Sequence, residues 1–366
     1  MKKGYYVFLG NGDYHPSLLK TKDWIPSWNL QEWKAFVDKL LSLPINTLMI
    51  YLNGHSLPYS SIYYPELMDL SHPNNQQEFL KELFVYIKSR GLQLIAVITT
   101  TGHAAKFSEL YKTAQIEVSQ EKILIENTLV SFPEHLRKDK LSKKEGAAQL
   151  GYGVLCHNKK EAKQYAINII SELIHLYGDY FDAIALHPPE FVYPCVCNAC
   201  KIQFNASGNR SIDWGNLEKR RAFFIKSYFA FQRDLLFPQI KRYLPRCTHL
   251  TFTIPWIFED FFTEIVPFIS KETTLIEWDY NLNFDRIASL KLRLCNYMSF
   301  GHALWFMPTA GFSFSNKQST EEQIAAVKHQ LNIAKETGVQ GIIHFLGPLE
   351  SKFLVETRVR VLSTSH

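Results

Sequence analysis

The sequence has no long hydrophobic run, few cysteines and only a small net charge. No apolar stretch approaches the ~20 residues that a membrane-spanning helix needs, so we expect no membrane span. The 40 Lys and Arg residues exceed the 35 Asp and Glu residues by five, and because this excess is spread out it does not favour a nucleic-acid partner. With 46% hydrophobic and 20% charged residues, the chain can bury a large core. A disordered or fibrous protein is therefore excluded.

Common cofactor and targeting motifs are also missing. The chain contains no P-loop, no G-x-G-x-x-G and no G-x-S-x-G pattern, so it predicts no organic cofactor and no nucleophile elbow. The apolar run at residues 5–9 is too short for a signal-peptide core, and no small-residue cleavage site follows it. The six cysteines are unevenly spaced, which is not typical of a disulfide framework. We therefore expect a cytoplasmic protein.

Short apolar runs alternate with longer stretches of helical periodicity along the chain. The expected strands are residues 5–9, 47–52, 92–99, 183–187, 250–254, 274–278, 303–307 and 341–345. The expected helices are residues 31–43, 75–90, 159–176, 217–243, 260–269, 285–298 and 320–337, with Asn158 as the N-cap of the third and a weaker helix at 351–362.

Eight such repeats predict an α/β fold, a single (β/α)8 TIM barrel over residues 1–366. A long insertion at residues 104–153 follows the third strand. A doubly wound sheet is the second choice, because the glycine-rich phosphate loop typical of that fold is absent.

In a barrel, the residues that follow each strand meet at the carboxyl-terminal rim, where barrel enzymes carry their active sites. Aromatic residues make up 14% of the chain, and aromatic clefts suit flat ligand faces such as sugars, although most of these rings must be core. Polar and aromatic side chains follow nearly every expected strand or lie near its end: Asp13, Asn53, His55, His103, Glu190, Trp256, Trp278, Asp279, Tyr280 and Trp305. Carboxylates, amides, imidazoles and indoles together fit a carbohydrate site.

Several of these segments resemble glycoside hydrolase family 20, the β-N-acetylhexosaminidases. Residues 91–104, which end in a Gly-His-Ala sequence, look like the third strand of that family, and residues 45–67 are similar to its second strand and following loop. A strand ending in Glu190, followed by Cys195-x-Cys197-x-x-Cys200, resembles a more distant group of family-20-like proteins with a Cys-rich loop after strand four. Residues 276–280 and 303–306 also have counterparts there, so the resemblance extends over roughly residues 45–348.

The resemblance implies a role for Glu190. In that family one Glu protonates the departing oxygen, the 2-acetamido group of the substrate is the nucleophile, and a neighbouring Asp orients that group. Glu190 matches the acid position, and an apolar setting beside Pro188, Pro189 and Phe191 would raise its pKa. The alternative is a surface Glu at the start of a loop.

The sequence departs from the family at Pro189, which stands where the family has its Asp. Proline cannot hold the acetamido group, so another carboxylate must do so, or the chemistry differs, or hydrolysis is lost. Glu277 and Asp279 are the natural substitutes, because period-two alternation puts both on one face of their strand and Trp278 and Tyr280 on the other. The alternative for this pair is a buried ion pair in the barrel.

The remaining rim residues are candidates for substrate binding. His103, Asn53 and His55 would bind hydroxyl groups or pair with a carboxylate, with a purely structural role as the alternative. Indole faces from Trp256, Trp278 or Trp305 would line the sugar-binding pocket, with Tyr280 and Asp13 as further candidates for substrate binding. The alternative for each Trp is a core position, since buried Trp is common.

The Cys195-x-Cys197-x-x-Cys200 cluster offers three thiolates to one tetrahedral Zn²⁺. The fourth ligand would be Cys156 or His157, of which we favour Cys156. Such a site would be closed and structural, and would hold the loop after Glu190. Free buried thiols and a redox role are the alternatives.

Taken together, the sequence predicts an exo-acting glycosidase for an N-acetylhexosamine-containing or related glycan or glycoconjugate, with Glu190 as general acid. One alternative is a two-carboxylate glycosidase for non-acetylated sugars. Others are a catalytically impaired, carbohydrate-binding barrel and a metal-assisted hydrolase that uses His103, His55 and Asp279.

Overall fold

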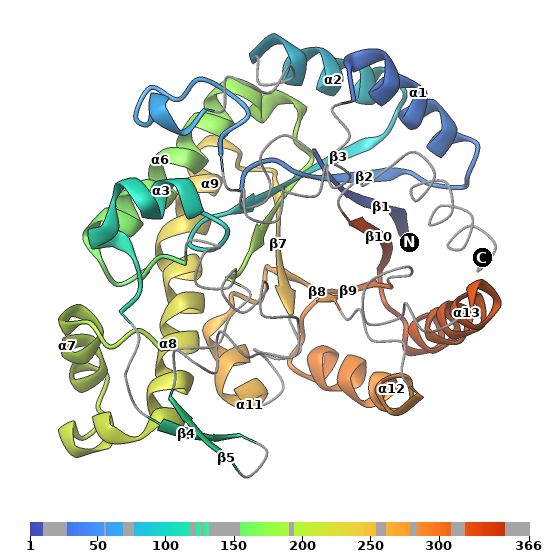
Figure 1. Ribbon diagram of the computed structural model, residues 1–366. Helices are drawn as coiled ribbons and strands as arrows, with labels where there is room; N and C mark the ends of the chain where they lie inside the picture. The colour runs from blue at the N-terminus through green and yellow to red at the C-terminus, as the bar shows by residue number, and fades with distance from the viewer. Residues whose placement is uncertain are drawn as a thin grey trace.

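Eight parallel strands close into a barrel (Figure 1). The computed structural model describes residues 1–9, 28–54, 56–68, 77–117, 122–125, 128–131, 154–189, 194–253, 261–278, 284–308 and 319–347. Around the barrel the strand order is β1-β10-β9-β8-β7-β6-β3-β2. The strands are β1 (Lys2–Phe8), β2 (Thr47–Tyr51), β3 (Gln93–Thr99), β6 (Ala183–His187), β7 (Thr248–Thr253), β8 (Thr274–Trp278), β9 (Leu304–Met307) and β10 (Gly341–Gly347).

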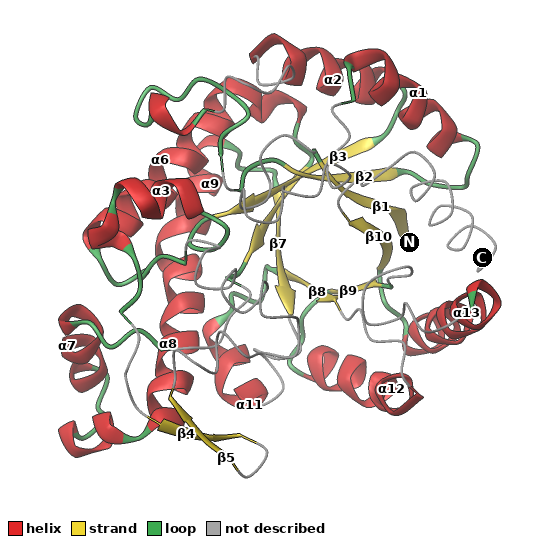
Figure 2. Ribbon diagram, viewed as in Figure 1, coloured by secondary structure: helices red, strands yellow, loops and turns green. Residues whose placement is uncertain are grey.

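Helices surround the barrel (Figure 2). They are α1 (Leu30–Leu41), α2 (Gln77–Ser89), α6 (Lys160–Tyr177), α8 (Leu217–Phe231), α9 (Phe237–Tyr243), α11 (Phe262–Ile265), α12 (Phe284–Ser299) and α13 (Thr320–Thr337). A π-helical turn at Gln232–Leu236 joins α8 to α9. Residues of the insertion form α3 (Ala105–Leu110) and the hairpin β4 (Lys122–Ile125) and β5 (Thr128–Ser131), and α7 (Asn198–Ala206) follows β6. None of the helices in the described part of the chain is both long and apolar enough to cross a membrane.

Local sequence signals set the ends of the outer helices. Asn29 caps α1 by accepting hydrogen bonds from the backbone of Gln31 and Glu32, and the Glu32 carboxylate accepts from the Asn29 backbone in return. Ser319 and Glu322 form the same capping box at α13. That helix ends at Gly338, whose φ of 87° lies in the left-handed region that glycine tolerates best.

The predicted barrel and its eight strands are confirmed. The predicted helix at 260–269 is only a short α11 followed by a 3-10 turn at Val266–Phe268. The prediction that Asn158 caps the helix before β6 is wrong, because Lys159 is the N-cap and the Asn158 amide donates to the Cys200 sulfur instead. The predicted helix at 351–362 lies outside the described residues.

Alternate side chains of each strand fill the barrel interior. The Tyr6 ring of β1 contacts Phe252 of β7, Trp278 of β8 and Phe345 of β10, with centroids 5.7, 6.3 and 5.1 Å away. Since these rings come from four strands spread around the barrel, they must point inward. The residues at the alternate positions along these strands, such as Glu277 next to Trp278, therefore face the surrounding helices.

Candidate functional site

Four side chains meet inside the barrel at its carboxyl-terminal end. Tyr51, His187 and Trp278 are the last residues of β2, β6 and β8, and His103 follows β3. The His187 ring lies 5.7 Å from Tyr51, 5.6 Å from His103 and 5.1 Å from Trp278, centroid to centroid. All four are buried. The structure thus brings together two residues that the sequence singled out, His103 and Trp278, and two that it did not, Tyr51 and His187.

A sharp turn at residues 99–104 holds His103. The hydroxyl of Thr99 donates to the carbonyl oxygen of Gly102 at 2.8 Å. His103 has a φ of 52°, in the left-handed region that residues with a Cβ atom seldom adopt. Gly102 lies directly against the end of β6, because a Cβ atom built on it would be 2.8 Å from the Cα atom of Pro189. Any larger residue at position 102 would push these two strand ends apart.

Asn53 fastens the end of β2 to the end of β3. Its side-chain nitrogen donates to the backbone oxygen of Thr99 at 2.8 Å, and its side-chain oxygen accepts from the Thr99 backbone nitrogen at 3.0 Å. Asn53 is fully buried. Both ends of the amide therefore bind the backbone beneath His103, which makes Asn53 a positioning residue in this structure.

Glu277 points out of the barrel toward α12. Its carboxylate accepts from the Thr253 hydroxyl at 2.6 Å and from Nε of Arg293 at 3.0 Å, and the side chain is 0% exposed. Burial, together with the Glu277 charge, raises the pKa of Tyr297 well above its usual value. This arrangement corresponds to the buried ion pair that was the alternative interpretation of Glu277.

The indoles of Trp278 and Trp305 lie at different heights in the barrel. Trp278 ends β8 and belongs to the ring cluster at the carboxyl end. Trp305 pairs in register with Gly341, the first residue of β10, and a Cβ atom on that glycine would be 2.7 Å from the indole. The structure therefore places Trp305 toward the amino-terminal end, away from His103 and His187.

The other predicted site residues lie outside the described residues: Asp13, His55, Glu190, Trp256, Asp279 and Tyr280. Their places in the chain are still informative, since Glu190 follows the last residue of β6 by three positions and Asp279 directly follows β8. Both of these strands end in the ring cluster, at His187 and Trp278.

A polar chain behind β6 supports the backbone of His187. The hydroxyl of Tyr228 lies 3.4 Å from the His187 carbonyl oxygen and accepts from the Gln232 side chain at 2.8 Å. Gln232 begins the π-helical turn and also accepts from the Thr251 hydroxyl at 3.1 Å. Such turns are frequent at functional sites, but no sequence pattern predicts this one.

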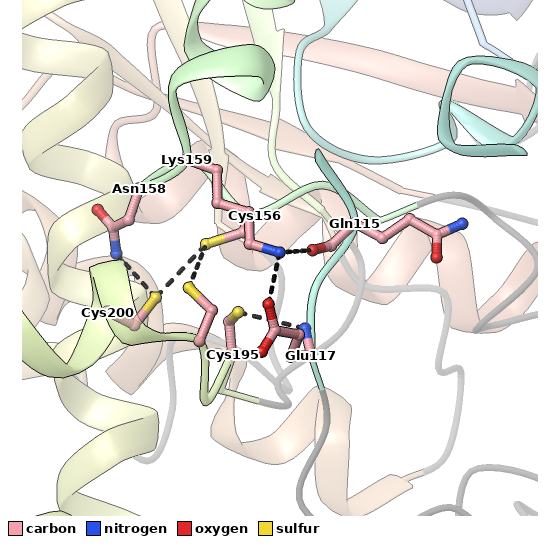
Figure 3. A network of polar contacts seen from close by, with 8 residues as sticks. Gln115, Glu117, Cys156, Asn158, Lys159, Cys195 and Cys200 are labelled. Carbon is pink, nitrogen blue, oxygen red and sulfur yellow. Dashed lines mark hydrogen bonds and ion pairs between the residues drawn. The ribbon is translucent and has the colours of Figure 1, made fainter. Parts of the chain in front are cut away.

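The four cysteines predicted as metal ligands do come together (Figure 3). The Sγ atoms of Cys156, Cys195, Cys197 and Cys200 lie within 4.8 Å of one another, and all four residues are buried. Cys156 Sγ is 3.4 Å from Cys200 Sγ and 3.8 Å from Cys197 Sγ. These residues can hold a metal ion.

His157, the alternative fourth ligand, is engaged elsewhere. Its Nε2 atom lies 2.7 Å from the hydroxyl of Ser227, and its ring packs on Phe224 with centroids 4.5 Å apart. Burial, followed by the charge of Lys163, lowers the pKa of His157 to about 3. The structure thus favours Cys156 over His157 as the fourth ligand.

Two hydrogen-bond donors contact the sulfurs of the cluster from outside it. The Asn158 amide donates to Cys200 Sγ at 3.2 Å, and the backbone nitrogen of Glu117 donates to Cys195 Sγ at 3.3 Å. Hydrogen bonds among the four sulfurs hold the pKa of Cys197 far below its usual range but raise the pKa of Cys156 far above it, so the cluster shares its protons unequally. Burial lowers the pKa of Lys159, but the Glu117 carboxylate and the neighbouring sulfurs outweigh this effect, so that Lys159 stays a cation beside the cluster.

Comparison with known proteins supports the fold. No protein-family model matches the sequence, and no curated protein matches it. Among solved structures, an inactive variant of the family 20 exo-β-N-acetylglucosaminidase of Vibrio harveyi superposes with a TM-score of 0.62 at 12% identity, covering 100% of this chain and 54% of that one. A β-N-acetylhexosaminidase of Bacteroides fragilis gives 0.58 at 12% identity, covering 100% and 65%.

A β-galactosidase of Halorubrum lacusprofundi gives 0.61 at 10% identity, covering 100% of this chain and 57% of that one. The chain therefore spans between about half and two thirds of the length of these enzymes. Many of its structural neighbours are family 20 hexosaminidases, so the resemblance drawn from the sequence is confirmed at the level of the fold, which is one that glycosidases share.

Proposed function

We propose that this protein is a glycosidase-like enzyme that acts on the non-reducing end of a glycan or glycoconjugate. Glu190 is the general acid that protonates the departing oxygen. The substrate is an N-acetylhexosamine-containing glycan or a close relative. The fold, shared with family 20 hexosaminidases and with a β-galactosidase, is one support for this proposal.

One observation carries the proposal. The rings of Tyr51, His103, His187 and Trp278 gather inside the carboxyl-terminal end of the barrel, where barrel enzymes hold their substrates. Aromatic faces suit the C–H surfaces of a sugar, and imidazoles suit its hydroxyl groups. Glu190 and Asp279 follow two of the strands that end in this cluster, by three residues and by one. An apolar setting raises the pKa of a carboxylic acid, and the proposed role of Glu190 requires such a setting.

Pro189 favours a second candidate function. Because proline cannot hold an acetamido group, substrate assistance would need another partner, and Asp279 is the carboxylate we assign to that task. If Asp279 instead acts directly on the sugar, Glu190 and Asp279 form a two-carboxylate pair for a non-acetylated substrate. Glu277 is left out of both schemes, since both of its oxygens are bound to Thr253 and Arg293.

A panel of aryl glycosides with and without a 2-acetamido group tests these candidates. Cleavage of acetamido sugars alone supports substrate assistance, whereas cleavage of plain sugars supports the two-carboxylate pair. Glu190→Gln should lose either activity, while Glu161→Gln, an exposed substitution on α6, should not. A folded protein that cleaves no member of the panel contradicts an enzymatic role, and sugar binding without turnover then supports a carbohydrate-binding barrel.

We also propose that the four-cysteine cluster holds a structural zinc ion. A Zn–S distance of about 2.3 Å places the sulfurs of a tetrahedral site about 3.8 Å apart, and two sulfur pairs here lie 3.4 and 3.8 Å apart. Four thiolate ligands close the site, so the ion would stabilise the local fold and leave no position for substrate. Elemental analysis should find one zinc per chain in the wild type. The control variant Cys295→Ser, which changes an exposed cysteine outside the cluster, should also keep its zinc, whereas Cys200→Ser should lose it.

Two further predictions from the sequence stay predictions. A cytoplasmic location is consistent with four thiols that are free to bind a metal. The carbohydrate partner follows from the proposed activity and is tested together with it.

A further inference from the structure

We propose that the four-cysteine centre positions the turn at residues 99–104 at the mouth of the barrel, so that occupancy of the centre controls the geometry around His103. The effect on activity rests on the proposed function, but the positioning itself does not. The inference follows a continuous path of backbone contacts from the sulfurs to the rings of the site.

The centre first joins three segments that are far apart in the sequence. The backbone nitrogen of Cys156 donates to the Ala114 oxygen at 2.9 Å, and that of Ile116 donates to the Val154 oxygen at 3.2 Å. Between the cysteines that follow β6, the backbone nitrogen of Val196 donates to the Glu117 oxygen at 2.8 Å. A metal ion bound to all four sulfurs would tie Cys156 to the segment at residues 195–200, and these hydrogen bonds attach residues 114–117 to both.

The second step leads from the centre to the turn. Leu155 is the residue before Cys156, is fully buried, and donates its backbone N–H to the carbonyl oxygen of Thr101 at 2.8 Å. Thr101 lies within the turn. Because a metal–sulfur bond fixes Cys156, it also fixes the adjacent Leu155 and hence this hydrogen bond.

The third step leads from the turn to the site. His103 adopts a left-handed conformation, with a φ of 52°, which is unfavourable for a residue with a side chain and persists only where the surroundings hold it. Gly102 packs on Pro189, the residue before Glu190. A turn released from Leu155 would let His103 relax and would remove the support on which Pro189 rests.

Hydrogen exchange on the full-length protein tests the positioning directly. The zinc-loaded wild type is compared with chelator-treated protein, with Cys200→Ser, and with Cys295→Ser as the matched control. Loss of the metal should accelerate exchange at least tenfold at the amides of Leu155 and Thr99, which donate to Thr101 and Asn53. Exchange at Leu275 on the far side of the barrel should stay unchanged, and added zinc should restore protection to the chelated wild type.

Two exchange results overturn the proposal. Unchanged exchange at Leu155 and Thr99 would mean that the centre does not hold the turn. Acceleration of the whole barrel, Leu275 included, would mean that the metal supports the fold as a whole and not this turn in particular.

Gly102→Ala tests the link from turn to site without touching a cysteine. The added methyl group meets the backbone of Pro189, so this variant should keep its full zinc content while kcat falls at least tenfold on the best glycoside of the panel. Wild-type activity in Gly102→Ala would overturn the link. A wild type that cleaves no glycoside would refute the proposed function alone, because the exchange comparison still decides whether the centre holds the turn.

Discussion

Glu277 and Arg293 form an ion pair between the barrel wall and α12, with Nε of the arginine 3.0 Å from the carboxylate and side-chain exposures of 0% and 11%. Buried pairs of this kind offset a large desolvation cost, so their geometry matters more than their number. The pair also explains why a carboxylate directly beside the rim need not be catalytic.

Removing one member of this pair should destabilise the fold strongly. Arg293→Met leaves the Glu277 carboxylate buried without its cation, and we expect the free energy of unfolding to fall by about 3–5 kcal/mol. The double variant Glu277→Leu, Arg293→Met should lose less than Arg293→Met alone, because no charge remains buried. Urea denaturation measures both, and a change below about 0.5 kcal/mol in the single variant, typical of surface sites, would contradict this account.

Glu172 on α6 anchors the loop that follows β2. It accepts from the Ser61 hydroxyl at 2.7 Å and from the backbone nitrogen of Ile62 at 2.6 Å, and it is 6% exposed. Glu172→Ala leaves these donors unsatisfied and should cost about 1–3 kcal/mol of stability. Glu161→Gln on the exposed face of the same helix is the control, and equal stability of the two variants in thermal denaturation would show that the anchor is unimportant.

Two buried histidines should make the fold less stable in mild acid. Burial lowers the pKa of both His249, which stacks on Phe237, and His302. In the unfolded chain these imidazoles titrate near their ordinary pKa of about 6.5. Below that pH the unfolded state therefore binds more protons than the folded state, and stability falls as the pH decreases.

The pH dependence of the unfolding free energy measures this effect. The double variant His249→Gln, His302→Gln should lose part of the slope between about pH 6.5 and pH 5. The comparison of variant and wild type separates the histidines from the cysteine centre, whose metal affinity also falls in acid. An identical slope in both proteins would exclude the two histidines as its source.

Trp278 and Trp305 form a matched pair for locating the site. Both indoles are buried inside the barrel, but only Trp278 belongs to the cluster at the carboxyl end. Trp278→Phe and Trp305→Phe should each cost a few kcal/mol of stability at most. We expect kcat/KM to fall at least tenfold only for Trp278→Phe, and an equal fall in both variants would contradict a site at the carboxyl end.

The barrel could be predicted because each strand and helix has its own signal in the sequence. The apolar runs from β1 to β10 and the helix ends at Asn29 and Gly338 do not depend on distant contacts. The cysteine cluster was also within reach, since three of its members lie within six residues of the sequence and Cys156 precedes the helix that leads into β6.

Other features depend on the register and tilt of the strands, which one sequence does not reveal. Alternation puts Glu277 and Trp278 on opposite faces of β8 but does not say which face is inside. The register of the barrel puts Trp305, the second residue of β9, opposite the first residue of β10 and so away from the carboxyl-terminal rim where the sequence analysis placed it. Asn158 is a residue type that favours the N-cap position, yet its side-chain amide donates to the Cys200 sulfur, 42 residues away in the sequence.

The dependence of hydrolysis on the leaving group in Glu190→Gln tests the central claim most directly. A general acid protonates the departing oxygen, so its loss should slow poor leaving groups by about 10²–10⁴-fold. Phenols as acidic as 2,4-dinitrophenol depart without a proton, and we expect their release to slow far less. An equal loss for both kinds of leaving group, or no loss for either, would contradict Glu190 as the general acid.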